Sequence, residues 1–199
     1  MKILVTGGAG FIGSHLVEEL LSNENEILIF DNCLTGKKEN LDIKGNFKFI
    51  NDDFGSENSL EEIERFNPDI CFHLAAQSSV VVSVENPALD FEHNILQPIK
   101  LIQVLLKSNC KKFVFTSSGG TIFGEPTTIP TAEEDYADEP ESPYGVAKKR
   151  LNELIKIMTK SSNLKYSILN LSNVYGPRQD PYGEAGVVSI FAKKYLNNE

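Results

Sequence analysis

Short runs of apolar residues alternate along the chain with longer segments in which apolar residues recur every three or four positions. The short runs predict six strands, at residues 2–6, 26–30, 47–50, 70–74, 112–116 and 166–171. The longer segments predict helices at residues 11–21, 59–66, 88–107 and 143–160, and a last helix that begins near residue 185 and continues to the end of the chain. Pro98 lies inside one of these segments and is expected to kink or interrupt that helix.

The predicted strands are almost wholly apolar, as in Ile3-Leu4-Val5, Ile27-Leu28-Ile29-Phe30 and Phe113-Val114-Phe115. Such strands are usually buried on both faces of a parallel sheet. Because strands alternate with crossover helices, the sequence predicts an α/β fold, a doubly wound parallel sheet (Rossmann fold) covered on both faces. Residues 125–143 contain four prolines and are predicted to form a solvated loop, in which six carboxylates follow Pro130: Glu133, Glu134, Asp135, Asp138, Glu139 and Glu141.

The composition is that of an ordinary globular protein, with 199 residues of which 41% are hydrophobic and 24% charged. The net charge is −9 and no stripe of basic residues occurs, which argues against nucleic acid as a partner. No run approaches the ~18 consecutive apolar residues of a membrane span, so no membrane association is expected. The apolar run before Thr6 is too short for the core of a signal peptide.

Neither the cysteines nor the histidines are spaced like a disulfide framework or a metal site. We therefore expect no metal and a reduced, cytoplasmic protein. The residues concerned are Cys33, Cys71, Cys110, His15, His73 and His93.

A glycine-rich turn follows the first predicted strand and opens the first predicted helix, with Gly7, Gly10 and Gly13 in a G-x-x-G-x-x-G arrangement. Gly7 permits a tight turn, Gly10 lets a pyrophosphate approach the backbone, and Gly13 lets the helix pack closely on the sheet. The free amides and the dipole of the helix N-terminus favour phosphate groups. The turn therefore predicts a dinucleotide-binding site.

Asp31 stands at the end of the second predicted strand, 18 residues after Gly13. A carboxylate at this place accepts hydrogen bonds from ribose hydroxyls and repels a 2′-phosphate, which favours NAD over NADP. The alternative is an aspartate that only begins the turn Asp31-Asn32.

Tyr144 and Lys148 lie four residues apart at the start of a predicted helix, for which Ser142 is the N-cap and Pro143 the first residue. Four-residue spacing places them on one helix face. A neighbouring ammonium group, the helix N-terminus and a positive nicotinamide ring would each favour tyrosinate, so we expect the pKa of Tyr144 to fall from about 10 towards neutrality. The alternative is an ordinary surface pair.

Eight motifs along residues 1–193 occur in one order: Thr6–Gly13, Asp31-Asn32, Asn51-Asp52-Asp53-Phe54, His73-Leu74-Ala75-Ala76-Gln77, Asn94, Thr116-Ser117-Ser118, Tyr144-x-x-x-Lys148 and Asn173-Val174-Tyr175-Gly176-Pro177-Arg178. In these motifs the chain resembles the extended short-chain dehydrogenase/reductases, and among them the NAD-dependent nucleotide-sugar epimerases of the UDP-glucose 4-epimerase type. The resemblance implies an NAD-binding Rossmann domain at residues 1–172. It also implies that residues 173–199 begin a substrate-binding lobe, most of which is missing from this sequence.

The resemblance implies which residues surround the NAD cofactor. Asp53 and Phe54 would flank the adenine, while for Asn94 a cofactor contact, a backbone contact and a surface position all stay open. The full set is Gly7, Gly10, Phe11, Ile12, Gly13, Asp31, Asn32, Thr35, Gly36, Asp53, Phe54, Leu74, Ala75, Ala76, Asn94, Thr116, Tyr144, Lys148 and Leu171.

The resemblance also implies a catalytic triad of Tyr144, Lys148 and Ser118, with Ser117 as the alternative serine. Substrate would contact Ser117, Ser118, Tyr144 and Asn173. No acidic residue follows the serines, unlike in the related dehydratases, which favours epimerisation at C4 of a nucleotide-diphosphate sugar. Phe123 stands where the family often has tyrosine, which leaves the preferred sugar open.

Two other functions stay open at this stage. One is an NAD-binding module without catalysis, because family members commonly reach about 300 residues and carry a further lobe. The other is a nucleotide-sugar reductase or dehydratase of the same family. By the same resemblance we expect a homodimer that pairs through the helices predicted at 88–107 and 143–160.

Overall fold

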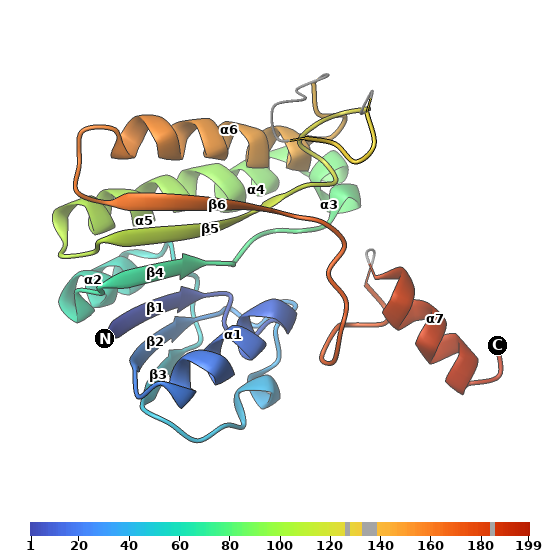
Figure 1. Cartoon of the computed structure of the whole chain (residues 1–199), viewed down its shortest axis with the longest axis horizontal. Helices are drawn as coiled ribbons and strands as arrows, with labels where there is room; N and C mark the ends of the chain where they lie inside the picture. The colour runs from blue at the N-terminus through green and yellow to red at the C-terminus, as the bar shows by residue number, and fades with distance from the viewer. Residues whose placement is uncertain (126–127, 133–138, 184–185) are drawn as a thin grey trace.

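The computed structural model describes residues 1–125, 128–132, 139–183 and 186–199. Its centre is a six-stranded parallel sheet of strand order β3-β2-β1-β4-β5-β6 (Figure 1). The strands are β1 (Lys2–Thr6), β2 (Glu26–Phe30), β3 (Phe47–Ile50), β4 (Ile70–His73), β5 (Lys112–Ser118) and β6 (Lys165–Leu171). The predicted strands and the doubly wound parallel sheet are thereby confirmed, and only the ends of some strands shift by one or two residues.

Three of the predicted helices form nearly as expected. They are α1 (Phe11–Ser22), α2 (Glu57–Phe66) and α6 (Pro143–Thr159). The last predicted helix is α7 (Val187–Leu196). Residue 185, near which it was predicted to begin, lies outside the described residues. The prediction that this helix continues to the chain end is wrong, because it ends at Leu196.

The segment predicted as one helix at 88–107 is a composite. It consists of α4 (Pro87–Phe91), a π-helical turn η2 (Glu92–Leu96) and α5 (Gln97–Lys107). Pro98 is the second residue of α5, and the wide π turn directly precedes it. Proline cannot donate a backbone hydrogen bond to the preceding turn, so the change of helix type at this point fits the predicted interruption.

Two short elements were not predicted, η1 (Lys38–Leu41) and α3 (Val80–Glu85). The sequence of α3 is rich in valine, which favours strands. The Ser79 side chain nevertheless caps the helix by accepting a hydrogen bond from the Val82 amide at 3.1 Å.

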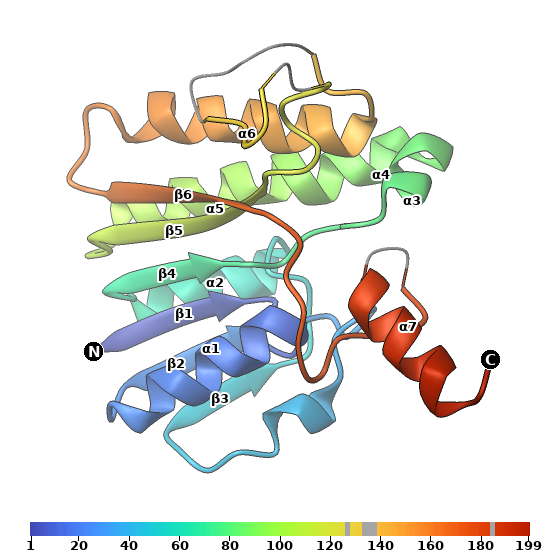
Figure 2. The ribbon, with the colours of Figure 1, turned by 45° about the vertical axis from the view of Figure 1, so that its right-hand side comes forward.

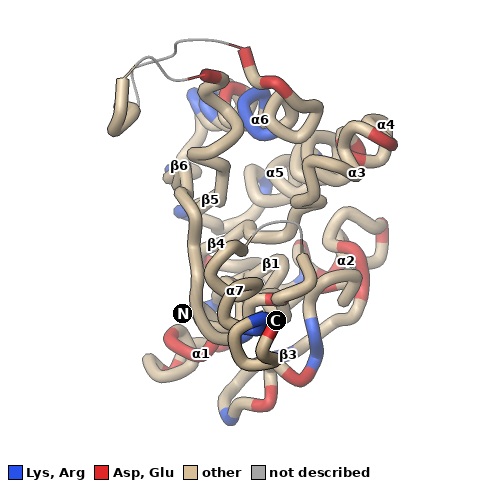
Figure 3. The backbone as a smooth tube through the Cα atoms, turned by 90° about the vertical axis from the view of Figure 1, so that its right-hand side faces the viewer, with Lys and Arg blue, Asp and Glu red and all other residues tan. Residues whose placement is uncertain are grey.

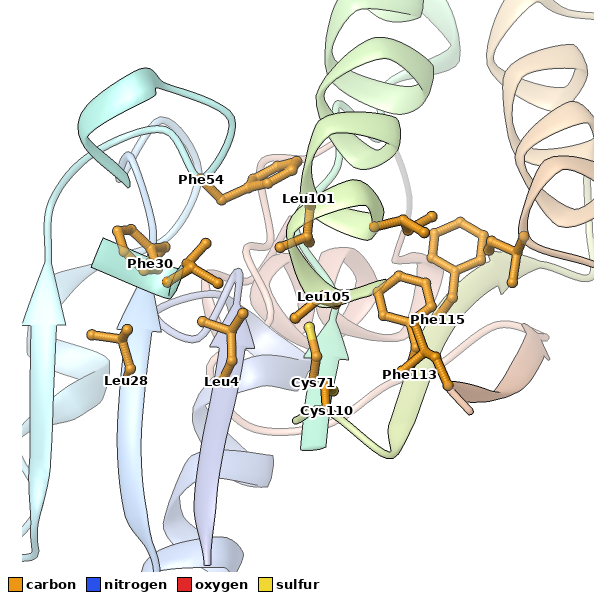
Figure 4. Packing of buried hydrophobic residues seen from close by; sticks show 14 of the residues in the cluster. Leu4, Leu28, Phe30, Phe54, Cys71, Leu101, Leu105, Cys110, Phe113 and Phe115 are labelled. Atoms are coloured by element: carbon orange, nitrogen blue, oxygen red, sulfur yellow. The ribbon is translucent and has the colours of Figure 1, made fainter. Parts of the chain in front are cut away.

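Each face of the sheet carries its own hydrophobic core. On one face, strand residues such as Leu4, Phe30 and Phe113 pack against α2, α5 and α6, as Figure 4 shows in part. On the other face, alternate strand residues, including Val5 and Ile29, pack against α1. This alternation explains the continuous apolar runs, because every position of an inner strand is buried on one side or the other.

β6 departs from the prediction that the strands are buried on both faces. Leu169 is 44% exposed, on the face opposite to that of Ile168, which packs on the core with α6, and no residue of α7 is buried. α1 covers the sheet only near β1 and β2, whereas the chain after β6 leaves the sheet and reaches α7 at the carboxyl side of the strands (Figure 2). One face of β6 is therefore open in the described part of the structure.

The predicted loop at 125–143 is described only in part, and Glu133, Glu134, Asp135 and Asp138 lie outside the described residues. Among the residues that are described, no helix is long and apolar enough to span a membrane. Nor does that part of the chain contain a group of three or more His, Cys, Asp or Glu side chains that could hold a metal ion.

Candidate active site

A cavity of about 660 Å³ opens at the carboxyl ends of β1 and β4. These strands are neighbours in the sheet although β2 and β3 separate them in the sequence. The chain therefore leaves them in opposite directions, and such a switch point is where open α/β sheets bind ligands. Predicted cofactor residues that line the cavity are Gly7, Gly10, Phe11, Ile12, Gly13, Asp31, Asn32, Thr35, Asp53, Phe54, Leu74, Ala75, Ala76 and Thr116.

The glycine turn has the shape that a pyrophosphate requires. A Cβ on Gly7 (φ 74°) would lie 2.6 Å from the Ala75 nitrogen, so only glycine fits between the two strand ends. A Cβ on Gly10 would meet only the Gly7 carbonyl, at 3.2 Å, which leaves its other side open to the cavity. No side chain caps the N-terminus of α1, so the amides of its first turn are free to bind phosphate oxygens.

Gly13 acts differently from the prediction. Its Cβ would lie 2.0 Å from the Gly7 carbonyl oxygen and 2.8 Å from the Gly8 Cα. The close approach that it permits is therefore between α1 and the backbone of the turn itself, rather than between α1 and the sheet.

The Asp31 carboxylate is buried at the cavity wall and accepts the Ala9 amide and the Cys33 amide, each at 2.9 Å. These two bonds fix the carboxylate while each oxygen keeps a lone pair for a further donor. A Cβ on Gly36 would lie 2.8 Å from the Asp31 side chain, so Gly36 packs over the carboxylate and does not line the cavity itself. The aspartate thus begins a turn and also faces the predicted ribose site.

Phe54 and Asp53 form the far end of the cavity. Phe54 is 5% exposed and packs edge-on against His73, with ring centroids 4.8 Å apart. The Asp53 carboxylate lies 3.5 Å from Nδ1 of His93, which also lines the cavity and was not predicted there. Phe54 is therefore mainly a core residue of which one part reaches the cavity.

Tyr144 and Ser118 meet at the start of α6. The Ser142 hydroxyl accepts the Gly145 amide at 3.1 Å and caps the helix, as predicted. A Cβ on Gly145 would lie 2.4 Å from the Thr121 carbonyl, so this glycine lets the helix approach the chain that follows β5. The hydroxyl of Tyr144 shares a hydrogen bond with Ser118, whereas the hydroxyl of Ser117 is buried without a partner in the described residues.

Lys148 is 3% exposed and donates a hydrogen bond to the Thr116 carbonyl at 3.0 Å. Its ammonium group also lies over the Phe115 ring, 4.6 Å from the centroid, and 5.8 Å from the centroid of the Tyr144 ring. Neither Lys148 nor Tyr144 lines the cavity, which reaches only to Thr116 on this side.

The expectation that the pKa of Tyr144 falls is wrong for the chain by itself. Burial and the Asp90 carboxylate raise the pKa of Tyr144 to about 12, against the lowering effect of Ser118. Burial lowers the pKa of Lys148 to about 8, although Asp90 raises it. The Lys148 charge is not among the effects that lower the pKa of Tyr144.

Asn94 lies in the π turn and is 2% exposed, so a surface position is excluded. Its amide nitrogen donates to the Gln77 carbonyl at 2.8 Å and to the Asp90 carboxylate at 2.9 Å, which makes it a backbone contact. Two further predicted site residues lie at the carboxyl end of β6, where Leu171 is half-buried and Asn173 is exposed. Neither Asn94, Leu171 nor Asn173 lines the cavity.

The chain after β6 contacts α1 and lines one side of the cavity with residues such as Gln179 and Asp180. Figure 3 shows the course of this segment between β6 and α7, seen from the carboxyl ends of the strands. Arg178 donates to Glu18 at 2.7 Å and to Ser14 at 3.3 Å, and His15 Nε2 lies 3.0 Å from the Pro177 carbonyl oxygen.

Further cavity residues that were not predicted are Phe30, Leu34, Lys37, Asn40, Asp52, Gln77, Ser78, Ser79, Val82, Leu89, Arg178, Gln179, Asp180 and Gly183. Their position at or after strand ends could have indicated that they line the cavity, because loops at the carboxyl edge of such a sheet surround its ligand.

Comparison with known proteins identifies this architecture. The sequence profile of the NAD dependent epimerase/dehydratase family matches residues 3–199. A putative UDP-glucose 4-epimerase of Methanocaldococcus jannaschii is 45% identical over 197 residues, which cover 99% of this chain and 64% of that protein. The chain thus spans about 64% of the length of this relative.

Two solved structures are similar over the whole chain. The UDP-glucose 4-epimerase of Thermotoga maritima with UDP-glucose has a TM-score of 0.94 and 45% identity, over 100% of this chain and 64% of its own. The Thermus thermophilus UDP-glucose 4-epimerase in complex with NAD has a TM-score of 0.91 and 44% identity, over 100% of this chain and 63% of its own.

Proposed function

We propose that this chain, which belongs to the NAD dependent epimerase/dehydratase family, binds NAD and supplies the catalytic residues of a nucleotide-sugar 4-epimerase. In this proposal residues 1–172 form the NAD-binding domain and residues 173–199 begin the substrate-binding region. The observation that carries the proposal is the position of the Tyr144–Ser118 pair near Thr116, where the cavity that contains the glycine turn ends on this side.

The cavity suits a dinucleotide over its whole length. The turn at Gly10 and the free amides of α1 would hold the pyrophosphate, and the fixed carboxylate of Asp31 would accept hydrogen bonds from the adenosine ribose. The same carboxylate would repel a 2′-phosphate, which favours NAD over NADP. The relative from Thermus thermophilus was solved with NAD.

Bound NAD would accept the C4 hydride of the sugar and return it to the opposite face of the sugar ring. Its positive nicotinamide ring would also favour tyrosinate. Tyr144 would take the proton of the 4-hydroxyl and later give it back. Ser118, which already shares a hydrogen bond with Tyr144, would hold the same substrate oxygen. Lys148 would act from behind Tyr144, since its ammonium group is held by the Thr116 carbonyl.

UDP-glucose and UDP-galactose, or their N-acetylated analogues, are the proposed substrates. The relative from Thermotoga maritima was solved with UDP-glucose. We also propose a homodimer that pairs through the helical segment of α4, η2 and α5 and through α6, because η2 exposes the apolar side chain of Leu96 and α6 that of Ile157.

The test is to denature the purified native protein, quantify the released NAD, and assay the native protein for interconversion of UDP-glucose and UDP-galactose and of their N-acetylated analogues. We expect about one NAD per chain and conversion without net consumption of added cofactor. Bound NAD without any conversion would instead identify a binding module. Stoichiometric consumption of NADH would identify a reductase, and conversion to a dehydrated sugar would identify a dehydratase.

A further inference from the structure

The segment that follows β6 forms part of the cavity wall, and its residues 174–180 are called the strap below. Arg178, Gln179 and Asp180 of the strap line the cavity. The first turn of α1, whose free amides are the proposed phosphate site, lines the same cavity. The strap and the proposed phosphate site therefore belong to one wall of the ligand cavity, provided that they are held together.

Polar contacts hold the strap against α1. Arg178 donates a hydrogen bond to the Glu18 carboxylate at 2.7 Å and one to the Ser14 hydroxyl at 3.3 Å. Nε2 of His15 lies 3.0 Å from the Pro177 carbonyl oxygen. The pair of Arg178 and Glu18 is the only one of these contacts that joins two opposite charges in the described residues.

The strap follows a single face of α1. A Cβ on Gly176 would lie 3.6 Å from the Phe11 ring, at ordinary van der Waals distance, so the strap also packs beside this ring. Counted from Phe11, the α1 partners of the strap stand at positions i, i+3, i+4 and i+7 and form one stripe along the helix. The stripe begins at Phe11, which itself lines the cavity.

Arg178 also has an unusual backbone conformation. Its φ is 68°, in the left-handed region that residues with a side chain adopt only at a cost in free energy. Such a conformation persists where the surrounding contacts hold it. Here the two side-chain bonds to α1 are contacts of that kind.

The next residue, Gln179, links the anchor to the cavity. Its Nε2 donates to the Val174 carbonyl at 3.1 Å and its backbone amide donates to the Gly176 carbonyl at 3.4 Å, so the strap is bonded to itself. Its Oε1 is buried and has no hydrogen-bond partner within the described residues. A buried acceptor of this kind is costly unless a ligand or a water molecule supplies the donor.

We infer that Arg178 and Glu18 are positioning residues, and that their ion pair holds the strap against α1 and so slows the release of NAD. A strap that detaches from α1 opens the wall beside the proposed phosphate site and takes Gln179 with it. The inference rests on the proposed function only in that NAD is the ligand of the cavity, and it requires no catalysis.

The test measures the rate at which NAD leaves the native protein. Protein loaded with radiolabelled NAD is mixed with an excess of unlabelled NAD, and the label that stays on the protein is followed with time. Glu18→Arg brings two positive side chains together, so the strap should detach and NAD should leave about tenfold faster. Arg178→Glu brings two carboxylates together and should have the same effect.

The exchanged pair is the decisive variant. Arg178→Glu combined with Glu18→Arg restores the attraction between the strap and α1, so the release rate should return to within about threefold of the wild-type rate. Because Arg178 lines the cavity, Arg178→Glu by itself could also repel the phosphates of NAD. The exchanged pair separates the two effects, since it keeps the carboxylate at position 178.

Glu19→Arg is the matched control. It makes the same change of charge on the next residue of α1, which is exposed and takes part in none of the ion pairs of the described residues. This variant should release NAD at the wild-type rate.

Three results overturn the inference. The first is a wild-type release rate in Glu18→Arg. The second is an exchanged pair that releases NAD as fast as Arg178→Glu, which means that the charge of Arg178 acts on NAD directly. The third is a Glu19→Arg variant as fast as Glu18→Arg. If Glu18→Arg does not fold, Glu18→Gln takes its place with release about threefold faster, and an unchanged rate there also overturns the inference.

These results are distinct from those that decide the proposed function. Faster release in Glu18→Arg that the exchanged pair reverses, in a protein without epimerase activity, supports the inference and removes the proposed catalysis. An active epimerase in which Glu18→Arg leaves the release rate unchanged contradicts the inference and leaves the proposed function intact. A native protein that holds no NAD, even after incubation with NAD, overturns both.

Discussion

Replacement of Tyr144 by phenylalanine should lower the rate of epimerisation by about 10² to 10⁴-fold, the usual contribution of a group that transfers a proton in the transition state. The variant keeps the ring beside Lys148 and loses only the hydroxyl that meets Ser118. The NAD content and the thermal unfolding should therefore change little. The measurement is kcat for the conversion of UDP-glucose to UDP-galactose.

Tyr166→Phe is the control for this change. Tyr166 lies near the start of β6, 39% exposed, and takes no part in the proposed chemistry. The kcat of the Tyr166→Phe variant should equal that of the wild-type protein. A loss of less than about tenfold in Tyr144→Phe, or 1.4 kcal/mol, would remove Tyr144 from the proposed mechanism.

Replacement of Gly13 by alanine should abolish NAD binding. The new Cβ would lie 2.0 Å from the Gly7 carbonyl oxygen, so the turn that receives the pyrophosphate must move. Overpacking of this kind costs about 1–3 kcal/mol of folding free energy in addition. The measurements are the NAD content after purification and the midpoint of thermal unfolding.

Two further variants make this result specific. Gly10→Ala should leave the fold intact, because its Cβ meets only the Gly7 carbonyl, at 3.2 Å, and should still weaken NAD binding, because it adds a methyl group to the turn that lines the cavity. Gly120→Ala is the control, since no atom lies within 4 Å of its Cβ, and it should keep its NAD. Normal NAD content in both Gly10→Ala and Gly13→Ala would contradict the assignment of the turn.

Local patterns in the sequence were sufficient to predict the fold and several residues of the cavity wall. The inner strands are apolar runs that must be buried on both faces, the positive φ of Gly7 is a local property that favours glycine, and the cap at Ser142 is made to the nearby Gly145 amide. These features follow from backbone sterics and hydrogen bonds of nearby residues, so a single sequence was sufficient to predict them.

Long-range polar contacts could not be predicted in the same way. Asp90 looks like an ordinary position of an amphipathic helix, and only the π turn and the loop at Gln77 enclose it in the interior. The rise of the Tyr144 pKa in the chain by itself was missed for the same reason, because the burial of Tyr144 and the carboxylate behind it depend on how α4 packs on α6.

In the proposed reaction hydride leaves C4 of the sugar and returns to the same carbon while Tyr144 carries the proton. This step can be followed by incubating the native protein in ordinary water with UDP-glucose deuterated at C4 and, in parallel, with UDP-N-acetylglucosamine deuterated at C4. We expect at least one of the two to give its 4-epimer with the deuterium still at C4. A 4-epimer that has exchanged this deuterium for solvent hydrogen, or the absence of a 4-epimer from both incubations, would rule the reaction out.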